Sequence, residues 1–299
     1  MAKEKNSIDS VKKSSIELKR YYQNFFDESA DYWGEVYKDG ICRKDDFQAK
    51  MLNARMGHAI RMCTEGVNEK LCVLEIGCGG GILAKKLSDL GHRVYAVDHS
   101  YQMVVNARQA TRGDYGQSPI FLGAGDVENL AFPPERFDRV TCLGVLMYLK
   151  SYDRAINEIK RVLKTEGIAI IAVSNKMRIE KLLDLPILLK KAILKLFKSK
   201  KIVPLNHCIP YRFNHRLKED GFEILEYMTH GFGPLTFNGK VVFSHRINSY
   251  VDDMLGKLSV LPVFSALGYT YIVKAKKLGI TGITENRSKM GISGYFGQP

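Results

Sequence analysis

The chain has 299 residues, 45% of them hydrophobic, which is ample for one large α/β domain with attachments. Its six cysteines form no Cys-x-x-Cys pair and no local cluster with histidine, so they indicate neither a zinc site nor a disulfide framework. The formal net charge is +13, and nine basic residues against two acidic ones between 176 and 201 account for more than half of it. Because the first residues are charged and no apolar run is long enough to span a bilayer, we expect a cytoplasmic protein.

Strand and helix patterns alternate along the chain from the first apolar run, which begins at Val73. The expected helices are an aromatic-rich segment at 14–37, then 46–63, 83–90, 101–110, 152–163 and 213–219. The expected later strands are 93–97, 120–124, 137–143, 167–173, 222–227 and 269–275. Five such alternations are typical of a parallel sheet with helices on both faces, that is, of an α/β fold.

Two strands of this pattern each carry a carboxylate. Glu75 stands just before a loop with glycines at 77 and 79–81, and Asp98 ends the next apolar run. In an open parallel sheet, ligands bind in the crevice outside the carboxyl ends of the strands. We therefore expect the loop and both acids to belong to one ligand pocket.

Two long connections, at 175–211 and 228–268, interrupt the end of the domain, and connections of this length usually form lids or substrate walls. We expect a helical cap at 1–66, a central domain at 67–278 and a flexible tail at 279–299. Within the first connection, residues 186–198 form a basic amphipathic pattern. Such a helix can lie on an anionic membrane, form a lid, or be an ordinary surface helix.

A series of motifs between 73 and 173 resembles, in unbroken order, the class I S-adenosylmethionine (SAM) dependent methyltransferases. In chain order they are Glu75 with Gly77-Cys78-Gly79-Gly80-Gly81, Asp98, Gly125-Asp126-Val127, 130–138, 144–149 and 163–167. The chain is similar in particular to the small-molecule and lipid type found in quinone and porphyrin pathways. The resemblance implies a seven-stranded Rossmann-like sheet, an N-terminal helical cap, and SAM as co-substrate without a metal.

The resemblance also implies a set of residues that hold SAM: Tyr32, Glu75, Gly77, Cys78, Gly79, Asp98, His99, Met103, Asp126, Val127 and Leu143. The glycines would let the backbone approach the methionyl part. Asp98 would accept hydrogen bonds from the ribose hydroxyls, and Asp126 from the adenine amino group. Glu75 would order the glycine loop near the amino-acid end. Tyr32 would meet the SAM carboxylate from a closing N-terminal segment, or would belong to an aromatic stripe that packs on the core.

An NAD-binding site is the rival interpretation of a glycine loop followed by an acid. The glycine spacing here is Gly-x-Gly-x-Gly rather than Gly-x-Gly-x-x-Gly, and Gly125-Asp126-Val127 belongs to the methyltransferase pattern. Both observations favour SAM.

Methyl transfer from a sulfonium is an in-line displacement that depends mostly on positioning, and a general base matters only if the acceptor starts protonated. Tyr148 stands where many relatives carry a histidine. The histidines of the two connections are further candidates: His207, His215, His230 and His245. We prefer Tyr148 and His207, because both are expected near the carboxyl edge of the sheet.

The apolar content of the connections predicts a hydrophobic or aromatic small-molecule acceptor, lipid-linked compounds included, methylated on oxygen. A C-methyltransferase of an activated aromatic or polyketide and an RNA methyltransferase are alternatives, as is a SAM-binding regulator without turnover. Nucleic acid is disfavoured, because base-methylating relatives carry Asn/Asp-Pro-Pro-aromatic after the fourth strand, whereas the proline pair here precedes it. The sequence predicts no particular oligomeric state.

Overall fold

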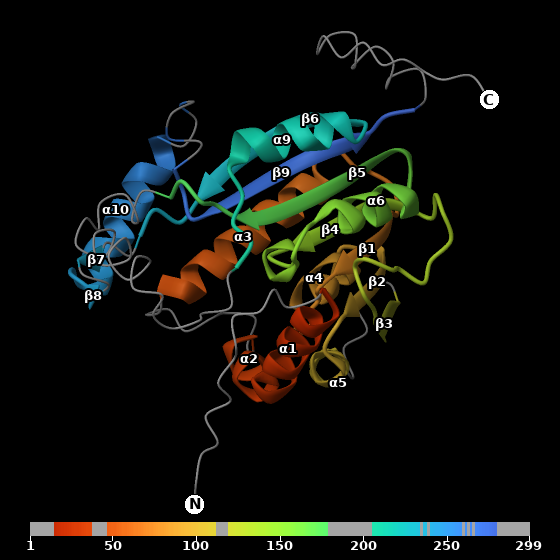
Figure 1. Ribbon diagram of the computed structural model, residues 1–299, viewed down its shortest axis with the longest axis horizontal. Helices are drawn as coiled ribbons and strands as arrows, with labels where there is room; N and C mark the ends of the chain where they lie inside the picture. Colours follow the sequence, from red (N-terminus) through yellow and green to blue (C-terminus); the bar gives the residue numbers. More distant parts are fainter. Residues whose placement is uncertain are drawn as a thin grey trace, which may run out of the picture.

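A computed structural model of the chain describes residues 15–37, 47–111, 119–178, 205–233, 236–237, 240–258, 261, 264 and 267–279. Its centre is a seven-stranded sheet with strand order β3-β2-β1-β4-β5-β9-β6 (Figure 1). The strands are β1 (Cys72–Ile76), β2 (Arg93–Asp98), β3 (Ile120–Ala124), β4 (Phe137–Leu143), β5 (Leu163–Ser174), β6 (Phe222–His230) and β9 (Thr270–Lys277). A separate pair consists of β7 (Thr236–Phe237) and β8 (Lys240–Val241).

The described helices begin before the sheet and continue between its strands. They are α1 (Ser15–Glu28), α2 (Ala30–Tyr37), α3 (Phe47–Thr64), α4 (Ile82–Asp89), α5 (Tyr101–Ala110), the 3-10 turn η1 (Leu146–Tyr148), α6 (Asp153–Val162), α9 (Pro210–Glu219) and α10 (His245–Leu258). None of the helices in the described ranges has the length and apolar character needed to span a bilayer.

The first five strands are mutually parallel, and the predicted α/β fold with a seven-stranded Rossmann-like sheet is confirmed. The last strand, β9, runs in the opposite direction. It lies between β5 and β6 and is antiparallel to both. An antiparallel neighbour needs only a return connection, whereas a parallel one needs a crossover. The chain between β6 and β9 makes such a return.

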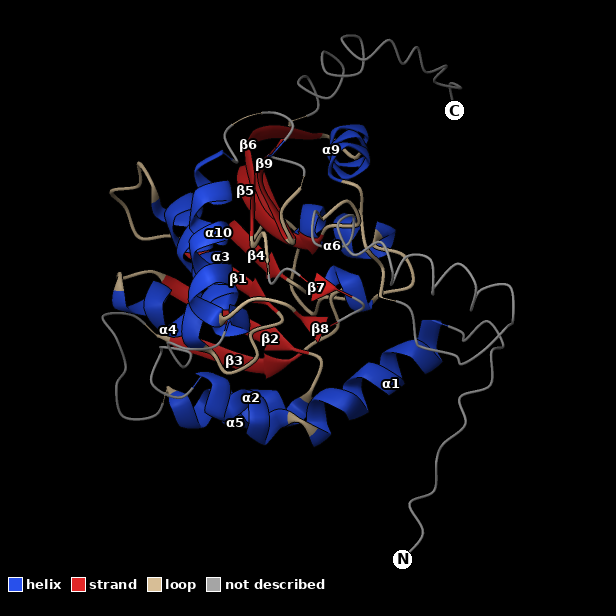
Figure 2. Ribbon diagram, turned by 90° about the vertical axis from the view of Figure 1, so that its left-hand side faces the viewer, coloured by secondary structure: helices blue, strands red, loops and turns tan. Residues whose placement is uncertain are grey.

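Side-chain alternation along the strands separates the core into two layers. In β1, Val73 packs in the layer beneath α3, α4 and α5, whereas Leu74 and Ile76 pack in the layer beneath α6 and α9. In β5, Ile170 and its neighbour Ile171 divide in the same way. Figure 2 shows the sheet between α3 and α4 on one side and α6 and α9 on the other.

Most predicted elements occur within a few residues of their expected bounds, and the helix at 101–110 occurs as predicted. It begins there because the Ser100 hydroxyl accepts a hydrogen bond of 3.1 Å from the backbone N–H of Met103. The predicted helical segment at 14–37 is divided at Ser29 into α1 and α2. The helix α10 and the β7–β8 hairpin lie in the second connection, where no element was predicted.

Some predicted features lie outside the described residues. They include the basic amphipathic segment 186–198 and, apart from residue 279, the tail at 279–299.

Candidate functional site

A cavity of about 700 Å³ lies at the carboxyl edge of the parallel strands. One part of its wall comes from the loop after β1 and the ends of β2 and β4, and the rest comes from α1, α2, α3 and the connection after β6. The position is the one that the doubly wound topology favours for ligands.

The glycine loop forms a floor of bare backbone. Gly77 adopts a φ of +75°, and a Cβ atom there would come within 2.2 Å of the Val145 side chain. The backbone N–H groups of Gly77 and Cys78 both donate to the Val97 carbonyl, at 2.8 and 3.1 Å, which ties the loop to β2. A side chain at Gly77 would therefore conflict with both the backbone conformation and the packing.

Asp98 lies at the end of β2 with both carboxylate oxygens engaged by backbone. Its Oδ2 accepts from the N–H of Gly79 and its Oδ1 from the N–H of Ser100, each at 2.9 Å. Burial raises the pKa of Asp98 above its ordinary value, although these hydrogen bonds oppose the shift. An ionised carboxylate has about four acceptor positions, so two remain for the hydroxyls of a ligand.

Asp126 also lines the cavity, where it forms an ion pair with Lys19 of α1. The Lys19 ammonium lies 2.6 Å from a carboxylate oxygen of Glu128 as well. Burial favours the neutral form of Asp126, but the hydrogen bond and charge of Lys19 and the hydrogen bond from the Glu128 backbone together lower the pKa of the carboxyl below its ordinary value. Asp126 is therefore an anion at neutral pH.

The loop side of the cavity also contains two ionisable side chains, Glu75 and Arg55, that are not matched to each other by a hydrogen bond or an ion pair among the described residues. Glu75 is buried, and its Oε2 atom has no hydrogen-bond partner among the described residues. The Arg55 side chain from α3 forms neither a hydrogen bond nor an ion pair within the described ranges. Both side chains line a recess of about 70 Å³ together with Gly77 and Gly79. A cationic amino group beside Glu75 and a carboxylate beside Arg55 would satisfy them, so this recess fits the amino-acid end of SAM.

The two N-terminal helices, α1 and α2, form part of the cavity wall. Asp27 of α1 accepts hydrogen bonds from the Ser100 hydroxyl and, at 3.3 Å, from the Gln102 backbone, so it stabilises the N-terminus of α5. The Asn106 amide donates to the Ala30 carbonyl of α2 at 2.9 Å. These contacts fix α1 and α2 on α5 and direct their aromatic side chains into the cavity.

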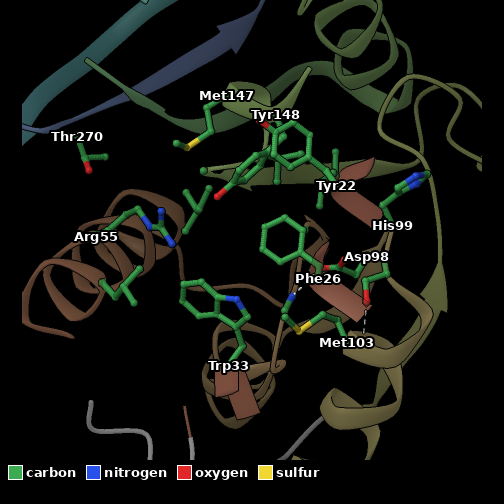
Figure 3. A pocket seen from close by; sticks show the side chains of 18 of the residues that line it. Tyr22, Phe26, Trp33, Arg55, Asp98, His99, Met103, Met147, Tyr148 and Thr270 are labelled. Atoms are coloured by element: carbon green, nitrogen blue, oxygen red, sulfur yellow. Dashed lines mark hydrogen bonds between the residues drawn. The ribbon is translucent and has the colours of Figure 1, made fainter. Parts of the chain in front are cut away.

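Those aromatic side chains gather with Tyr148 of η1 into one cluster. The ring centroid of Tyr148 lies 4.8 Å from that of Tyr22 and 5.1 Å from that of Phe26, and Phe26 lies 6.5 Å from Trp33. Figure 3 shows these rings around the same space as Asp98, with Arg55 on the opposite side. Burial, then the nearby phenols of Tyr148 and Tyr21, raises the pKa of Tyr22 to about 12.

The structure brings most of the sequence-predicted site residues together. The residues that line the main cavity are Gly77, Gly79, Asp98, His99, Met103, Asp126, Val127, Leu143 and Tyr148. Glu75 and Cys78 line the smaller recess. Tyr22, Phe26 and Trp33 of α1 and α2, and Arg55 of α3, line the cavity without having been predicted as site residues, because only the packing of these helices on the sheet brings them there.

Two predicted residues are placed elsewhere. Tyr32 is 55% exposed and does not line the cavity, whereas its neighbour Trp33 does. His207 also lies outside the lining, and its Nδ1 is 2.8 Å from the Ser174 hydroxyl at the end of β5.

The other candidate histidines are also absent from the cavity lining. His215 lies 3.4 Å from Glu219 on α9. His230 is buried behind α3, and burial, followed by the charges of His58 and Arg55, lowers its pKa to about 3. The side chain of His245 lies outside the described part of the structure. No cluster of His, Cys, Asp and Glu suited to a metal ion occurs among the described residues.

Comparison with known proteins agrees with this geometry. A family model described as a methyltransferase domain matches residues 74–171. The ubiquinone biosynthesis O-methyltransferase of Glaesserella parasuis serovar 5 is 29% identical over 173 residues, covering 56% of this chain and 71% of the relative. That of Rhodopseudomonas palustris strain HaA2 is 28% identical over 139 residues, covering 46% of this chain and 49% of the relative, so this match spans about half of that enzyme's length.

Among solved structures, the magnesium protoporphyrin IX methyltransferase of Synechocystis PCC 6803 with bound SAH has a TM-score of 0.59 at 20% identity. The alignment covers 87% of this chain and 99% of that chain, and it shows a shared fold. Residues 74–171 therefore form a methyltransferase domain, and over a longer stretch the chain is similar to curated SAM-dependent O-methyltransferases.

Proposed function

We propose that the protein transfers the methyl group of SAM to an oxygen of a hydrophobic, aromatic small molecule in the cytoplasm. The observation that carries the proposal is that one continuous cavity joins a half built from glycines and carboxylates to a half built from aromatic and apolar side chains. The first half suits a charged nucleoside, and the second suits a planar apolar acceptor.

The residues of the first half have distinct proposed roles. Asp98 accepts hydrogen bonds from the ribose hydroxyls, and Asp126 accepts one from the adenine amino group, whose ring lies between Met103 and Val127. Arg55 binds the carboxylate, and Glu75 faces the amino group. Tyr32, which was expected to meet the SAM carboxylate, is exposed and does not line the cavity, so we propose that its neighbour Trp33 lies against SAM in its place.

The bound sulfonium supplies an electrophilic methyl group, and the chain supplies alignment and exclusion of water. The cluster of Tyr22, Phe26 and Tyr148 would hold the acceptor ring beside that methyl group. With its pKa raised to about 12, Tyr22 stays protonated at neutral pH and serves as a hydrogen-bond donor rather than as a base. We propose a similar positioning role for Tyr148. His207 contacts Ser174 instead of the lining, so we assign it to the support of the loop before α9.

A transfer assay with methyl-labelled SAM tests the proposal. Purified protein is incubated with lipid and small-molecule extracts, RNA and protein extracts in parallel, and the label is counted after partition into organic solvent. We expect the label in the organic phase, dependent on wild-type protein and lost with Asp98→Asn. Label confined to RNA or protein would contradict the proposal, and the position of the methyl group on the product separates O-methylation from C-methylation.

A further inference from the structure

Helix α10 carries an apolar stripe on its outer surface. Ile247, Tyr250, Met254 and Leu258 recur at helical spacing and are 48%, 71%, 46% and 36% exposed. In a helix that packs on a protein core, such a stripe normally faces inward. Here it forms an apolar face that no described residue covers, and we call these four residues the α10 outer face.

Polar contacts hold the inner side of α10 against the protein. The exposure of the α10 outer face therefore follows from the orientation of the helix. Asn248 is buried and donates to the Phe243 carbonyl at 2.8 Å, and Asp252 accepts from the Phe232 backbone at 2.7 Å. Lys50 of α3 lies 2.7 Å from Asp253 and 3.4 Å from Asp252. The orientation of α10 is thus set by its anchoring to α3 and to the end of β6.

Two cations, Arg246 and Lys257, lie beside the outer face, as does the exposed acid Asp253, which is paired with Lys50. Arg246 precedes Tyr250 by one turn and Lys257 follows Met254 by one turn, and both are exposed without an ion pair to any described residue. The acids of α10, Asp252 and Asp253, both face Lys50. An apolar stripe with unpaired cations along its edge is the pattern of helices that lie in the interface of an anionic bilayer, where the long side chains extend toward the headgroups.

Part of the cavity wall comes from the segment that leads into α10. Val241 and Phe243 line the cavity and are also 58% and 43% exposed, and Phe237 of β7 is 62% exposed. Figure 1 shows α10 and the β7–β8 hairpin at the same end of the molecule. Exposed apolar side chains therefore occur both on α10 and among the residues that line the cavity.

We infer that the α10 outer face docks on an anionic phospholipid bilayer and brings the cavity wall at Val241 and Phe243 to the lipid surface. Two observations point to a bilayer rather than a protein: the cations Arg246 and Lys257 at the edge of the face, and the exposed apolar side chains of Val241 and Phe243 that also line the cavity. Delivery of an apolar acceptor from the bilayer rests on the proposed function, whereas the docking itself does not.

Vesicle flotation with the full chain, in the absence of SAM, tests the docking. The protein is mixed with vesicles of phosphatidylcholine alone or with phosphatidylglycerol added. We expect flotation with the anionic vesicles that weakens as salt rises. The double variant Tyr250→Ser/Met254→Ser should lower the partition constant by about tenfold or more, because two apolar side chains no longer leave water. Arg246→Glu/Lys257→Glu should lower it about fivefold for each charge removed, and further for each negative charge added.

Matched controls come from the opposite side of the sheet. Tyr211→Ser on α9 removes a side chain that is 78% exposed, and Arg154→Glu on α6 reverses an exposed charge. Both should float like wild type. The docking is wrong if the α10 variants also float like wild type, if wild type floats with neither vesicle, or if the α10 variants instead convert a wild-type dimer to a monomer. Methyl transfer in detergent solution is measured separately: its failure with intact flotation would contradict the proposed function alone.

Discussion

The Oδ2 atom of Asp98 accepts a hydrogen bond of 2.9 Å from the backbone N–H of Gly79, which joins the end of β2 to the loop after β1. The contact places an anionic side chain directly beside bare backbone. The end of β2 supplies the carboxylate, and the glycine loop after β1 leaves space for a ligand beside it. The two motifs follow neighbouring parallel strands and therefore lie at the same edge of the sheet.

Replacement of Asp98 by asparagine should weaken SAM binding by about 10- to 100-fold, since hydrogen bonds to a charged group contribute about 1.5–3 kcal/mol. Calorimetric titration with SAH measures this. Asp89→Asn, at the end of α4 and paired with Lys85 on the surface, is the control and should bind like wild type. Equal affinity of Asp98→Asn and wild type would remove Asp98 from the binding site.

Gly77→Ala should lower the free energy of unfolding by about 1–3 kcal/mol, because the φ of +75° and the contact with Val145 both oppose a Cβ atom. Gly57→Ala is the matched control. Gly57 lies within α3 with open space around its Cβ position, so alanine there should stabilise the protein by about 1 kcal/mol. Urea denaturation of both variants gives the comparison, and a Gly77→Ala variant as stable as wild type would contradict the account of the loop.

Arg55→Met should weaken the binding of SAH by about tenfold or more while leaving that of 5′-methylthioadenosine unchanged, because only SAH has the carboxylate that the guanidinium would bind. Arg61→Met, which removes a surface ion pair with Glu65 and Glu226, should change neither affinity. If Arg55→Met weakened both ligands equally, the effect would come from the shape of the cavity and not from recognition of the carboxylate.

Glu75 should make stability depend on pH. Burial raises its pKa well above the ordinary value, so between its unfolded and folded pKa the unfolded chain has released a proton that the folded chain still holds. The free energy of unfolding therefore decreases as the pH rises above about 4.3, the ordinary pKa of glutamate. Glu75→Gln should lose less stability than wild type between that pH and neutrality.

Glu158→Gln is the control with the opposite sign. The hydrogen bond from Arg161 lowers the pKa of Glu158, so this carboxylate contributes stability above its unfolded pKa that is lost as the pH falls through the folded one. Thermal unfolding of the free protein from below the ordinary glutamate pKa, about 4.3, up to neutrality separates the two, because the effect of Glu158 lies below that pKa and the effect of Glu75 lies above it. Parallel curves for Glu75→Gln and wild type would mean that Glu75 is not buried as a neutral acid.

The sequence predicts the parallel half of the sheet well because local signals agree there. The strand at 120–124 and the helix at 101–110 have the expected bounds, since alternation, the Ser100 cap and flanking turns all favour them. The antiparallel direction of β9 depends on how a long connection returns, and no local pattern encodes it.

The site residues likewise fall into two groups: those that the sequence locates and those that only the tertiary fold brings to the cavity. Asp98 and Asp126 follow strands and can be located from spacing, whereas Arg55 enters from α3 through tertiary packing alone. Tyr32 and Trp33 are adjacent on α2, and only the contact of this helix with α5 decides which of them lines the cavity. The helix α10 was missed because Tyr250 and Met254 face outward while the polar Asn248 is buried, which departs from the pattern for a core-facing helix.

The central claim is that this one cavity unites SAM with an apolar, aromatic acceptor. The most direct measurement is mass spectrometry of an organic extract that has been incubated with isotope-labelled SAM and either wild type or Asp98→Asn. We predict one organic-soluble compound that gains a labelled methyl group on oxygen with wild type and gains none with the variant. Turnover of SAM with no labelled organic-soluble compound, or labelled products that persist unchanged with Asp98→Asn, would contradict the claim.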